Sequence, residues 1–198
     1  MACRCVAASV GPFGACLADG SEYHGRYAAD WAEVRAFHRR RLEVLVDSGP
    51  DAFAIETMPG IVEARIVIEE LRTLSSTPAW VSFTCNDSHT TCAGDPITAA
   101  VEAVAPMADA VGVNCTHPGF VAPLLRDASL VTDLPLVAYP NHGAAWDAVA
   151  KCWIGTADGT DLPVHLAEWL AAGTRLVGGC CGVGTKGIAA LAAARAHH

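Results

Sequence analysis

Three cysteines follow two short apolar runs, and thiols in such positions are candidate ligands for a soft metal ion. Cys115 comes directly after Ala110–Asn114, and the pair Cys180 and Cys181 follows the run Leu-Val-Gly-Gly at 176–179. Thiolate ligands favour zinc over magnesium or calcium. Three protein ligands that leave a fourth position open are typical of catalytic zinc sites. The sequence therefore predicts a Zn2+ site formed by Cys115, Cys180 and Cys181.

Two other interpretations of these cysteines stay open on the residues alone. Free cysteine is among the most buried residue types, so the three thiols could be ordinary core residues. Adjacent cysteines can also form a strained disulfide or a redox pair. The other six cysteines open the chain, lie in loops or flank a polar loop, and we assign them to packing or to the surface: Cys3, Cys5, Cys16, Cys85, Cys92 and Cys152.

The elements that position these residues alternate between strand-like and helix-like segments. Helices are expected over about 30–48, 61–74, 96–104, 120–127, 162–172 and 186–196, and the segment 144–161 is expected to be an extended, irregular loop. Such alternation is typical of an α/β fold with a parallel sheet covered by helices, either an open doubly wound sheet or a barrel. The predicted strands are Cys5–Val10, Ala52–Glu56, Trp80–Thr84, Ala110–Asn114, Leu136–Tyr139 and Arg175–Val177.

Polar and reactive residues gather directly after the predicted strands. Both architectures place their functional sites at the carboxyl ends of strands. The segment Gly11–Gly14 matches neither glycine-rich phosphate-binding motif, which makes a nucleotide site after the first strand less favoured. The residues that follow strands are Glu56, Thr84, Cys115, Asn141, Cys180 and Cys181.

Composition excludes several kinds of partner and suggests a compartment. The 198 residues carry a net charge of −8 and no basic stripe, which argues against nucleic acid and anionic membranes as partners. The cationic run His38–Arg41 is interpreted as a solvated helix face. The nine cysteines are an odd number and follow no secretory signal, so a reducing, cytoplasmic location with free or metal-bound thiols is expected. No apolar stretch approaches the ~18 residues of a membrane span.

Six separated motifs agree with one known family in both sequence and order. They are Ala7–Gly25, Ile55–Pro59, Val81–Thr84, Val113–Cys115, Val137–Asn141 and Gly178–Gly182. Together they resemble the zinc-dependent homocysteine S-methyltransferases, most closely the bacterial and plant enzymes that use S-methylmethionine. The resemblance covers essentially the whole chain. One departure follows the cysteine pair, where the family often has Arg-Thr-Thr-Pro and this chain has Gly-Val-Gly-Thr at 182–185, so the donor specificity stays open.

The resemblance implies a (β/α)8 TIM barrel with zinc at its C-terminal mouth. About six β/α units are present here, so residues 1–198 are expected to form a single homocysteine-binding domain of an incomplete barrel that lacks the N-terminal part of the family. An open barrel leaves two sheet edges with unpaired backbone groups, which can pair with other chains. An oligomer or a partner that covers these edges is therefore expected.

The resemblance also implies a reaction and its site. A methyl group would move from a sulfonium donor, S-methylmethionine or S-adenosylmethionine, to zinc-bound homocysteine thiolate, giving methionine; betaine also carries a methyl group on a cationic centre. Glu56 would bind the homocysteine ammonium, although a carboxylate satisfied by nearby backbone donors is an equal interpretation. Thr84, Asn114 and Asn141 are weaker candidates for polar groups of the pocket.

Two histidines and two tryptophans near the predicted ligands are not assigned to the metal site. His117 and His142 are interpreted as loop residues, because the family uses three cysteines. Trp146 and Trp153 could face a sulfonium by cation–π attraction, but packing is the favoured interpretation. Two further functions stay open, an inactive truncated barrel that binds zinc or a partner chain without turnover and a thiol redox protein that uses Cys180 and Cys181.

Overall fold

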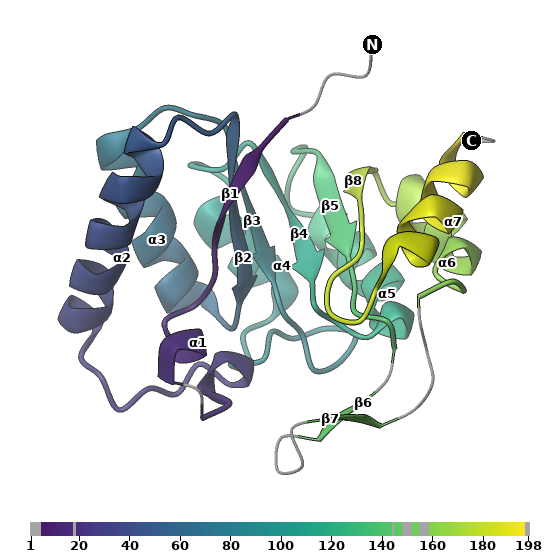
Figure 1. Cartoon of the computed structure of the whole chain (residues 1–198), viewed down its shortest axis with the longest axis horizontal. Coiled ribbons are helices and arrows are strands. Elements are labelled where there is room, and N and C mark those ends of the chain that lie inside the picture. Colours follow the sequence, from purple (N-terminus) through teal and green to yellow (C-terminus); the bar gives the residue numbers. More distant parts are fainter. Residues whose placement is uncertain (1–4, 18, 144, 148–151, 155–158, 197–198) are drawn as a thin grey trace.

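A curved, six-stranded parallel sheet forms the centre of the molecule (Figure 1). The computed structural model describes residues 5–17, 19–143, 145–147, 152–154 and 159–196. The strand order β1-β2-β3-β4-β5-β8 follows the order in the sequence, which confirms the predicted parallel sheet. The strands are β1 (Ala7–Val10), β2 (Ala52–Met58), β3 (Ala79–Phe83), β4 (Ala110–Asn114), β5 (Leu136–Tyr139) and β8 (Thr174–Val177).

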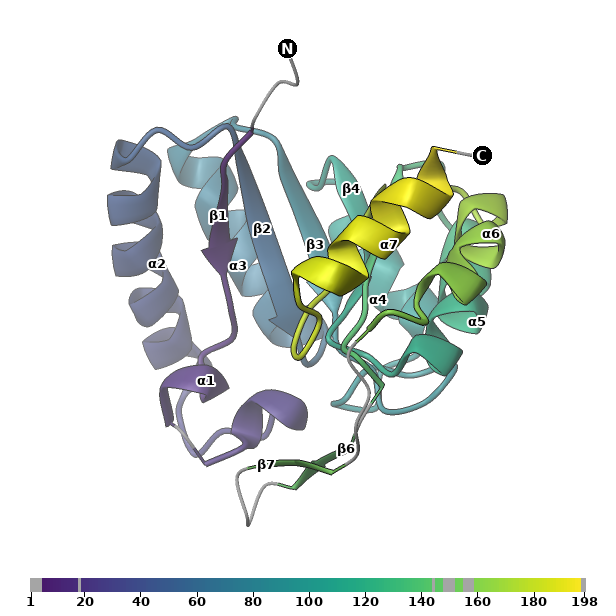
Figure 2. The ribbon, with the colours of Figure 1, turned by 45° about the vertical axis from the view of Figure 1, so that its right-hand side comes forward.

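The helices between residues 31 and 195 form one row along the sheet, each packed against the next (Figure 2). A doubly wound sheet reverses its strand order at a switch point, whereas this order never reverses. The arrangement is therefore that of an incomplete (β/α) barrel with six strands. The helices are α1 (Gly14–Leu17), α2 (Trp31–Asp47), α3 (Ile61–Leu74), α4 (Ile97–Val104), α5 (Pro118–Ser129), α6 (Pro163–Ala171) and α7 (Thr185–Arg195), with a 3-10 turn, η1 (Ser21–Tyr23).

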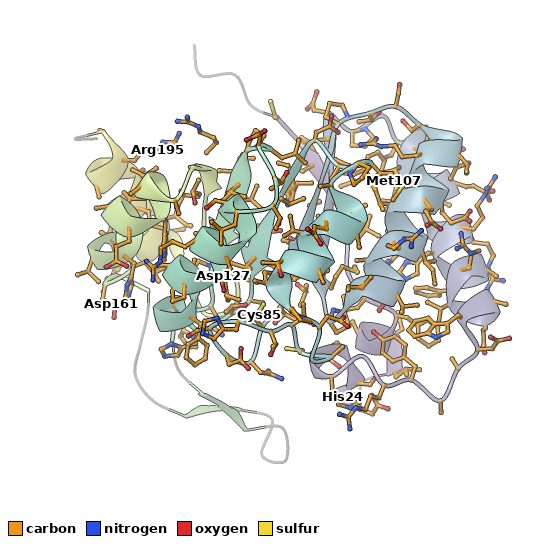
Figure 3. The ribbon with its side chains drawn as sticks, turned by 180° about the vertical axis from the view of Figure 1, so that it is seen from behind. His24, Cys85, Met107, Asp127, Asp161 and Arg195 are labelled. Atoms are coloured by element: carbon orange, nitrogen blue, oxygen red, sulfur yellow. The ribbon has the colours of Figure 1, made fainter. Side chains whose placement is uncertain are left out.

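The hydrophobic core lies between this row of helices and the sheet. Fully buried side chains include Phe53 and Ile55 of β2 and Leu71 of α3. The two ends of the sheet are distinct: Cys85 follows β3 at one end, and Met107 precedes β4 at the other (Figure 3). None of the helices in the described ranges is long and apolar enough to cross a bilayer.

Gly112 fixes the contact between β4, which precedes Cys115, and the neighbouring strand β5. It pairs with Val137, and a Cβ atom at Gly112 would lie 2.0 Å from the carbonyl oxygen of Val137. Only glycine allows this approach without a shift of the backbone. The same register pairs Asn114 with Tyr139, so the glycine sets how the two strand ends meet.

The segment expected to be an irregular loop contains a two-stranded antiparallel hairpin. Strand β6 (Ala145–Asp147) pairs with β7 (Cys152–Ile154), and the pair extends beyond the carboxyl ends of the parallel strands (Figure 1). The prediction of a structureless loop was wrong here, because aromatic residues at the centre of both short runs favour paired strands. The side chains of Trp146 and Trp153 lie outside the described part of the structure. The contact with a sulfonium suggested for them therefore stays a prediction.

The basic run His38–Arg41 lies on α2, and two of its residues are not solvent-facing as expected. His38 is fully buried, with Nε2 2.8 Å from Glu63 Oε1, and Arg41 donates to the backbone oxygen of Gly11 at 2.6 Å. The interpretation of this run as a solvated face was wrong for both residues. A buried carboxylate must be paired or hydrogen-bonded, and α2 supplies the partner because it packs directly on α3.

Helix ends agree with the expected boundaries to within a few residues. Asp30 caps α2 as predicted, since its Oδ1 accepts from the backbone N–H of Ala32 at 3.3 Å. Helix α5 begins two residues earlier than expected, at Pro118. Proline is favoured in the first turn of a helix, where its missing N–H has no partner to lose.

Candidate metal centre

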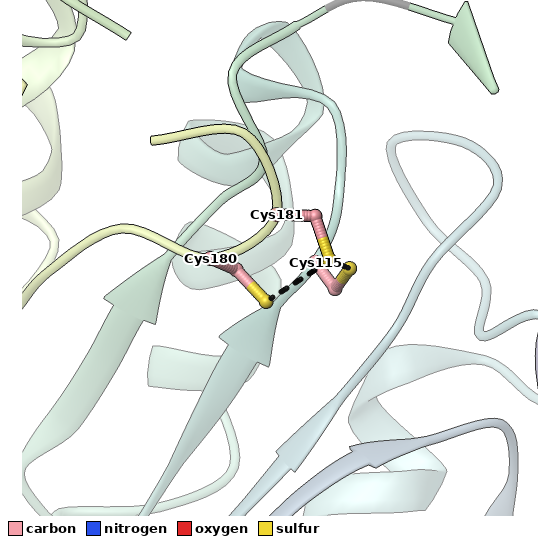
Figure 4. A group of neighbouring side chains, drawn as sticks. All are labelled: Cys115, Cys180 and Cys181. Carbon is pink, nitrogen blue, oxygen red and sulfur yellow. Dashed lines mark hydrogen bonds between the residues drawn. The ribbon is translucent and has the colours of Figure 1, made fainter. Parts of the chain in front are cut away.

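The sulfur atoms of Cys115, Cys180 and Cys181 lie within 4.8 Å of one another (Figure 4). Cys115 Sγ is 3.4 Å from Cys181 Sγ, and Cys180 Sγ is 3.9 Å from Cys181 Sγ. The fold therefore brings together the three predicted ligands from two strand ends. Within the described ranges, no other group of three or more His, Cys, Asp or Glu side chains is placed to share a metal ion.

The segment 139–142, at the end of β5, holds the two halves of the cluster together. Carbonyl groups of this segment accept from the backbone N–H of Cys115 at 3.1 Å and of Cys180 at 2.7 Å. The N–H of His142 donates to the carbonyl of Cys181 at 3.0 Å. Because β5 lies between β4 and β8, this segment fixes the spacing of the cysteines through backbone bonds alone.

The geometry fits a soft, tetrahedral metal ion. Ligand sulfur atoms at the ~2.3 Å bond length of a tetrahedral zinc site are about 3.8 Å apart. The separations of 3.4 and 3.9 Å bracket that value. Three soft thiolates with no hard oxygen donor among them suit zinc rather than magnesium or calcium.

The thiols also perturb one another strongly. Hydrogen bonds from Cys115 and then Cys180 lower the pKa of Cys181 to about 3. The pKa of Cys115 is raised far above its usual range. The first cause is the hydrogen bonds of its thiol with Cys180 and Cys181, and the second is burial. The cluster therefore favours one thiolate, and full metal coordination must release the remaining protons.

Asn114 lies beside the cluster and is fully buried. Its Oδ1 accepts from Thr57 N at 2.7 Å and from Ser82 Oγ at 2.8 Å. Its Nδ2 donates to Thr57 Oγ1 at 2.8 Å and lies 3.8 Å from Cys180 Sγ. These contacts use the full hydrogen-bonding capacity of the amide.

Thr84 and Asn141, two of the residues suggested for the pocket, both bond to the protein itself. Thr84 is buried, and its Oγ1 donates to the carbonyl of Cys115 at 3.2 Å. Asn141 Oδ1 accepts from Gly143 N at 2.9 Å and closes a tight turn. Both residues border the cluster, so a direct contact of either with a substrate stays a prediction.

Glu56 lies in β2, within electrostatic reach of the cluster. Its carboxylate accepts from Ser9 Oγ at 2.5 Å and opposes the ionisation of Cys181. It also contributes, after burial, to a pKa of Tyr139 well above the usual range. A half-buried carboxylate beside a thiol cluster can take a cationic group of a ligand that also carries a sulfur atom.

Tyr139, Ser82 and Thr57 were not among the predicted site residues. The hydroxyl of Tyr139 accepts from Trp80 Nε1 at 2.9 Å and lies 2.6 Å from Ser82 Oγ, which joins it to Asn114. These polar side chains interrupt otherwise apolar strands, and that interruption is the sequence signal that could have marked them. Together they form a polar layer beneath the cluster.

The two histidines near the ligand loops differ from each other. His117 caps α5 by accepting from Gly119 N at 3.2 Å, as suits a loop residue. His142 is buried, and a Cβ atom at Gly182 would lie 2.4 Å from its ring. The ring of His142 therefore fills the space that a side chain at position 182 would need.

Comparisons with known proteins match nearly the whole chain. The family model for homocysteine S-methyltransferase matches residues 1–195. Homocysteine S-methyltransferase 4 of Zea mays is 45% identical over 197 residues, which are 96% of this chain and 58% of that protein. Homocysteine S-methyltransferase of Escherichia coli (strain K12) is 43% identical over 191 residues, 95% of this chain and 62% of that protein.

A solved structure is similar to this chain in both sequence and fold. The metallated form of the homocysteine methyltransferase MmuM from Escherichia coli superposes with a TM-score of 0.82 at 40% identity, covering 96% of this chain and 60% of that one. The chain thus spans about three fifths of the length of the relatives it matches.

Proposed function

This chain belongs to the homocysteine S-methyltransferase family, and from that premise we propose that it transfers a methyl group to the sulfur of homocysteine, giving methionine. The donor would be a sulfonium compound, S-methylmethionine or S-adenosylmethionine. The observation that carries this function is the three-thiol cluster of Cys115, Cys180 and Cys181 at the carboxyl ends of β4 and β8.

Cys115, Cys180 and Cys181 would hold Zn2+. A structure of the Escherichia coli relative is of a metallated form. The ion, when bound, supplies a Lewis acid that lowers the pKa of a thiol, and the thiolate is the reactive nucleophile. The role of the chain is to present three ligands and leave the remaining position to the substrate.

Glu56 would orient homocysteine through its ammonium group. The carboxylate is half-buried on β2, and its charge is felt at Cys181. The metal site would thus hold the sulfur of homocysteine, and Glu56 would hold its amino group. Thr84, Asn114 and Asn141 would shape the polar wall between them.

The transfer itself needs no acid or base from the chain. A bond forms between the homocysteine sulfur and the methyl carbon while the bond from that carbon to the sulfonium sulfur breaks. The donor leaves as a neutral thioether, so nothing has to be protonated, and the thiol proton has already gone to solvent. Alignment of the two reactants would provide much of the remaining acceleration. We therefore assign no catalytic residue beyond the metal ligands.

We further propose that residues 1–198 act as one homocysteine-binding domain whose open sheet is covered by an oligomer or a partner. Both edge strands, β1 and β8, present unpaired backbone groups. Large apolar side chains near these edges are exposed, with Val6 66% and Leu176 48% accessible. A cytoplasmic location would suit Cys16, Cys85 and Cys92, which lie outside the cluster and form no disulfide.

A second candidate function is metal or partner binding without turnover. It is favoured by the open inner face of the sheet in the described part of the chain. Six strands in place of the eight of a closed barrel leave the inner face of the sheet open.

A methyl-transfer assay separates the two functions. The chain is incubated with homocysteine and either sulfonium donor, with and without a zinc chelator, and methionine is measured. Methionine that depends on bound zinc supports the methyltransferase. Stoichiometric zinc without methionine from either donor leaves the binding function. A chain that takes up no zinc overturns the methyltransferase and the metal-binding function.

A further inference from the structure

Two residues with a left-handed backbone lie beside Asn114, one bonded to its side chain and the other next to it in the sequence. Thr57, after Glu56 in β2, has φ 60°, and Cys115, after β4, has φ 48°. These are the only non-glycine residues with left-handed φ in the part of the chain that the structure describes. The conformation is especially unfavourable for a β-branched residue such as Thr57. Such strain persists only where the surrounding contacts enforce it, and it is typical of functional sites.

Asn114 supplies the contacts that enforce it at Thr57. Its amide binds both the backbone N–H of Thr57, at 2.7 Å, and the hydroxyl of Thr57, at 2.8 Å. It reaches Thr57 across β3, which lies between β2 and β4 in the sheet. One amide therefore replaces the direct backbone pairing that two non-adjacent strands cannot make.

The same amide reaches the metal ligands. Asn114 immediately precedes Cys115, and its Nδ2 lies 3.8 Å from Cys180 Sγ. Its side chain is fully buried and fully hydrogen-bonded, so it has no free group to offer a substrate. Whatever Asn114 does for the reaction, it does through Thr57 and the cysteines.

We propose that Asn114 is a positioning residue that sets the geometry between the thiol cluster and Glu56. On one side its amide fixes the irregularity of β2 at Thr57, directly after Glu56; on the other it orients the sulfur of Cys180. The inference rests on the proposed function, because it assigns the metal to the cysteines and the substrate ammonium to Glu56.

Two nearly isosteric variants separate the two sides. Asn114→Asp keeps the oxygen that accepts from Thr57 N, and its second oxygen, in the place of Nδ2, can accept from the Thr57 hydroxyl but cannot donate to Cys180 Sγ, so the variant disturbs the metal side. Thr57→Val keeps the branched shape and the backbone N–H but removes the hydroxyl that Asn114 binds, so it disturbs the Glu56 side. Each variant is the control for the other, and circular dichroism with thermal unfolding identifies a variant that fails to fold.

Zinc affinity is measured by competition with a chromophoric chelator. Homocysteine binding is measured from the thiolate charge-transfer band of the protein loaded with cobalt(II). Asn114→Asp is expected to weaken zinc binding by about 10-fold or more, the usual effect of altering a residue behind the ligands. Thr57→Val is expected to leave zinc affinity within about 2-fold and to raise the half-saturating homocysteine concentration at least about 3-fold, because the ammonium site is misaligned.

Each result decides one point. A folded Asn114→Asp variant with zinc affinity equal to that of the original chain overturns the metal side, and an unchanged homocysteine response in Thr57→Val overturns the Glu56 side. If the original chain binds zinc but transfers no methyl group, the proposed function is contradicted. The inference about Asn114 is still tested in that case, because the two variants are compared with the original chain by zinc affinity and homocysteine binding, not by turnover. A chain without zinc affinity overturns the inference together with the function.

Discussion

At the scale of single residues, the candidate site depends on sulfur chemistry and on glycine. The three cysteines supply soft ligands in a small volume, with sulfur atoms no more than 4.8 Å apart. The loop that carries two of them turns at Gly182, whose φ of +76° favours glycine. Changes at these positions should therefore affect metal binding before they affect the sheet.

Replacing one ligand should remove most of the metal affinity. Cys115→Ser exchanges a thiolate for a hydroxyl that stays protonated at neutral pH, and we expect zinc affinity to fall at least about 100-fold. Cys92→Ser is the matched control, because Cys92 is half-buried and outside the cluster. Metal analysis after dialysis gives the measurement. One tightly bound zinc per chain in Cys115→Ser would show that the ligand assignment is wrong.

Adding a methyl group at Gly182 should destabilise the ligand loop. The new Cβ would lie 2.4 Å from the ring of His142 in a left-handed conformation, so we expect Gly182→Ala to cost about 1–3 kcal/mol of unfolding free energy. Gly184→Ala is the control two residues away, where no atom lies within 4 Å of the added Cβ. Urea unfolding compares the two. Equal losses would contradict the contact between Gly182 and His142.

At the scale of elements, each helix is fixed to its neighbour, and the contact between α2 and α3 contains a buried polar cluster. Glu63 of α3 accepts from Phe13 N, from Tyr27 through its hydroxyl, and from His38 Nε2 at 2.8 Å. His38 Nδ1 in turn lies 2.8 Å from Arg41. One carboxylate thus connects two helices with the segment that leaves β1.

This cluster should make stability depend on pH. Burial lowers the pKa of His38, with Glu63 opposing that shift and Arg41 adding to it. As the pH falls through about 6.5, the unfolded chain therefore binds more protons at this residue than the folded chain does. The contribution of His38 to stability is therefore complete above about pH 6.5 and is lost as the pH falls, at up to about 1.4 kcal/mol per pH unit.

Urea unfolding at pH 7.5 and 5.5 tests this dependence against His38→Gln, which keeps a donor toward Glu63 but does not titrate. The original chain should lose more stability than the variant over this range. Parallel losses in the two proteins would mean that other groups cause the acid sensitivity.

Local patterns predicted the elements well, and long-range contacts explain what they missed. Helix α3 has the predicted bounds Ile61–Leu74, because Pro59 and Gly60, directly before it, mark where the chain turns from β2 into the helix. The cysteines could be grouped because carboxyl ends of parallel strands share one edge. The bond from Asn114 to Thr57 joins residues 57 positions apart, and no local pattern shows such a pair. His38 was misjudged for the same reason, since Glu63 lies 25 positions away.

At the scale of the whole molecule, the open sheet is the feature that most constrains function. The six strands leave β1 and β8 as separate edges, and the inner face between them carries a pocket lined by Trp80, Tyr139 and Leu176. A closed barrel buries this face. The three proposed ligands all lie in this chain, whereas the inner face of its sheet is open in the part that the structure describes.

The exposed inner face should drive association of the chain. Leu176 is 48% exposed beside this pocket, on the edge strand β8, and burial of such apolar surface favours pairing with another chain. We expect Leu176→Lys to shift the chain toward the monomer at micromolar concentration in analytical ultracentrifugation. Val164→Lys is the control, because Val164 is 75% exposed but lies on α6, away from that pocket. If association persists in Leu176→Lys, or falls equally in Val164→Lys, the inner face is not the contact. If it falls only in Leu176→Lys, the surface that forms a barrel interior in longer relatives serves here as the interface, and the candidate site is completed by whatever covers it.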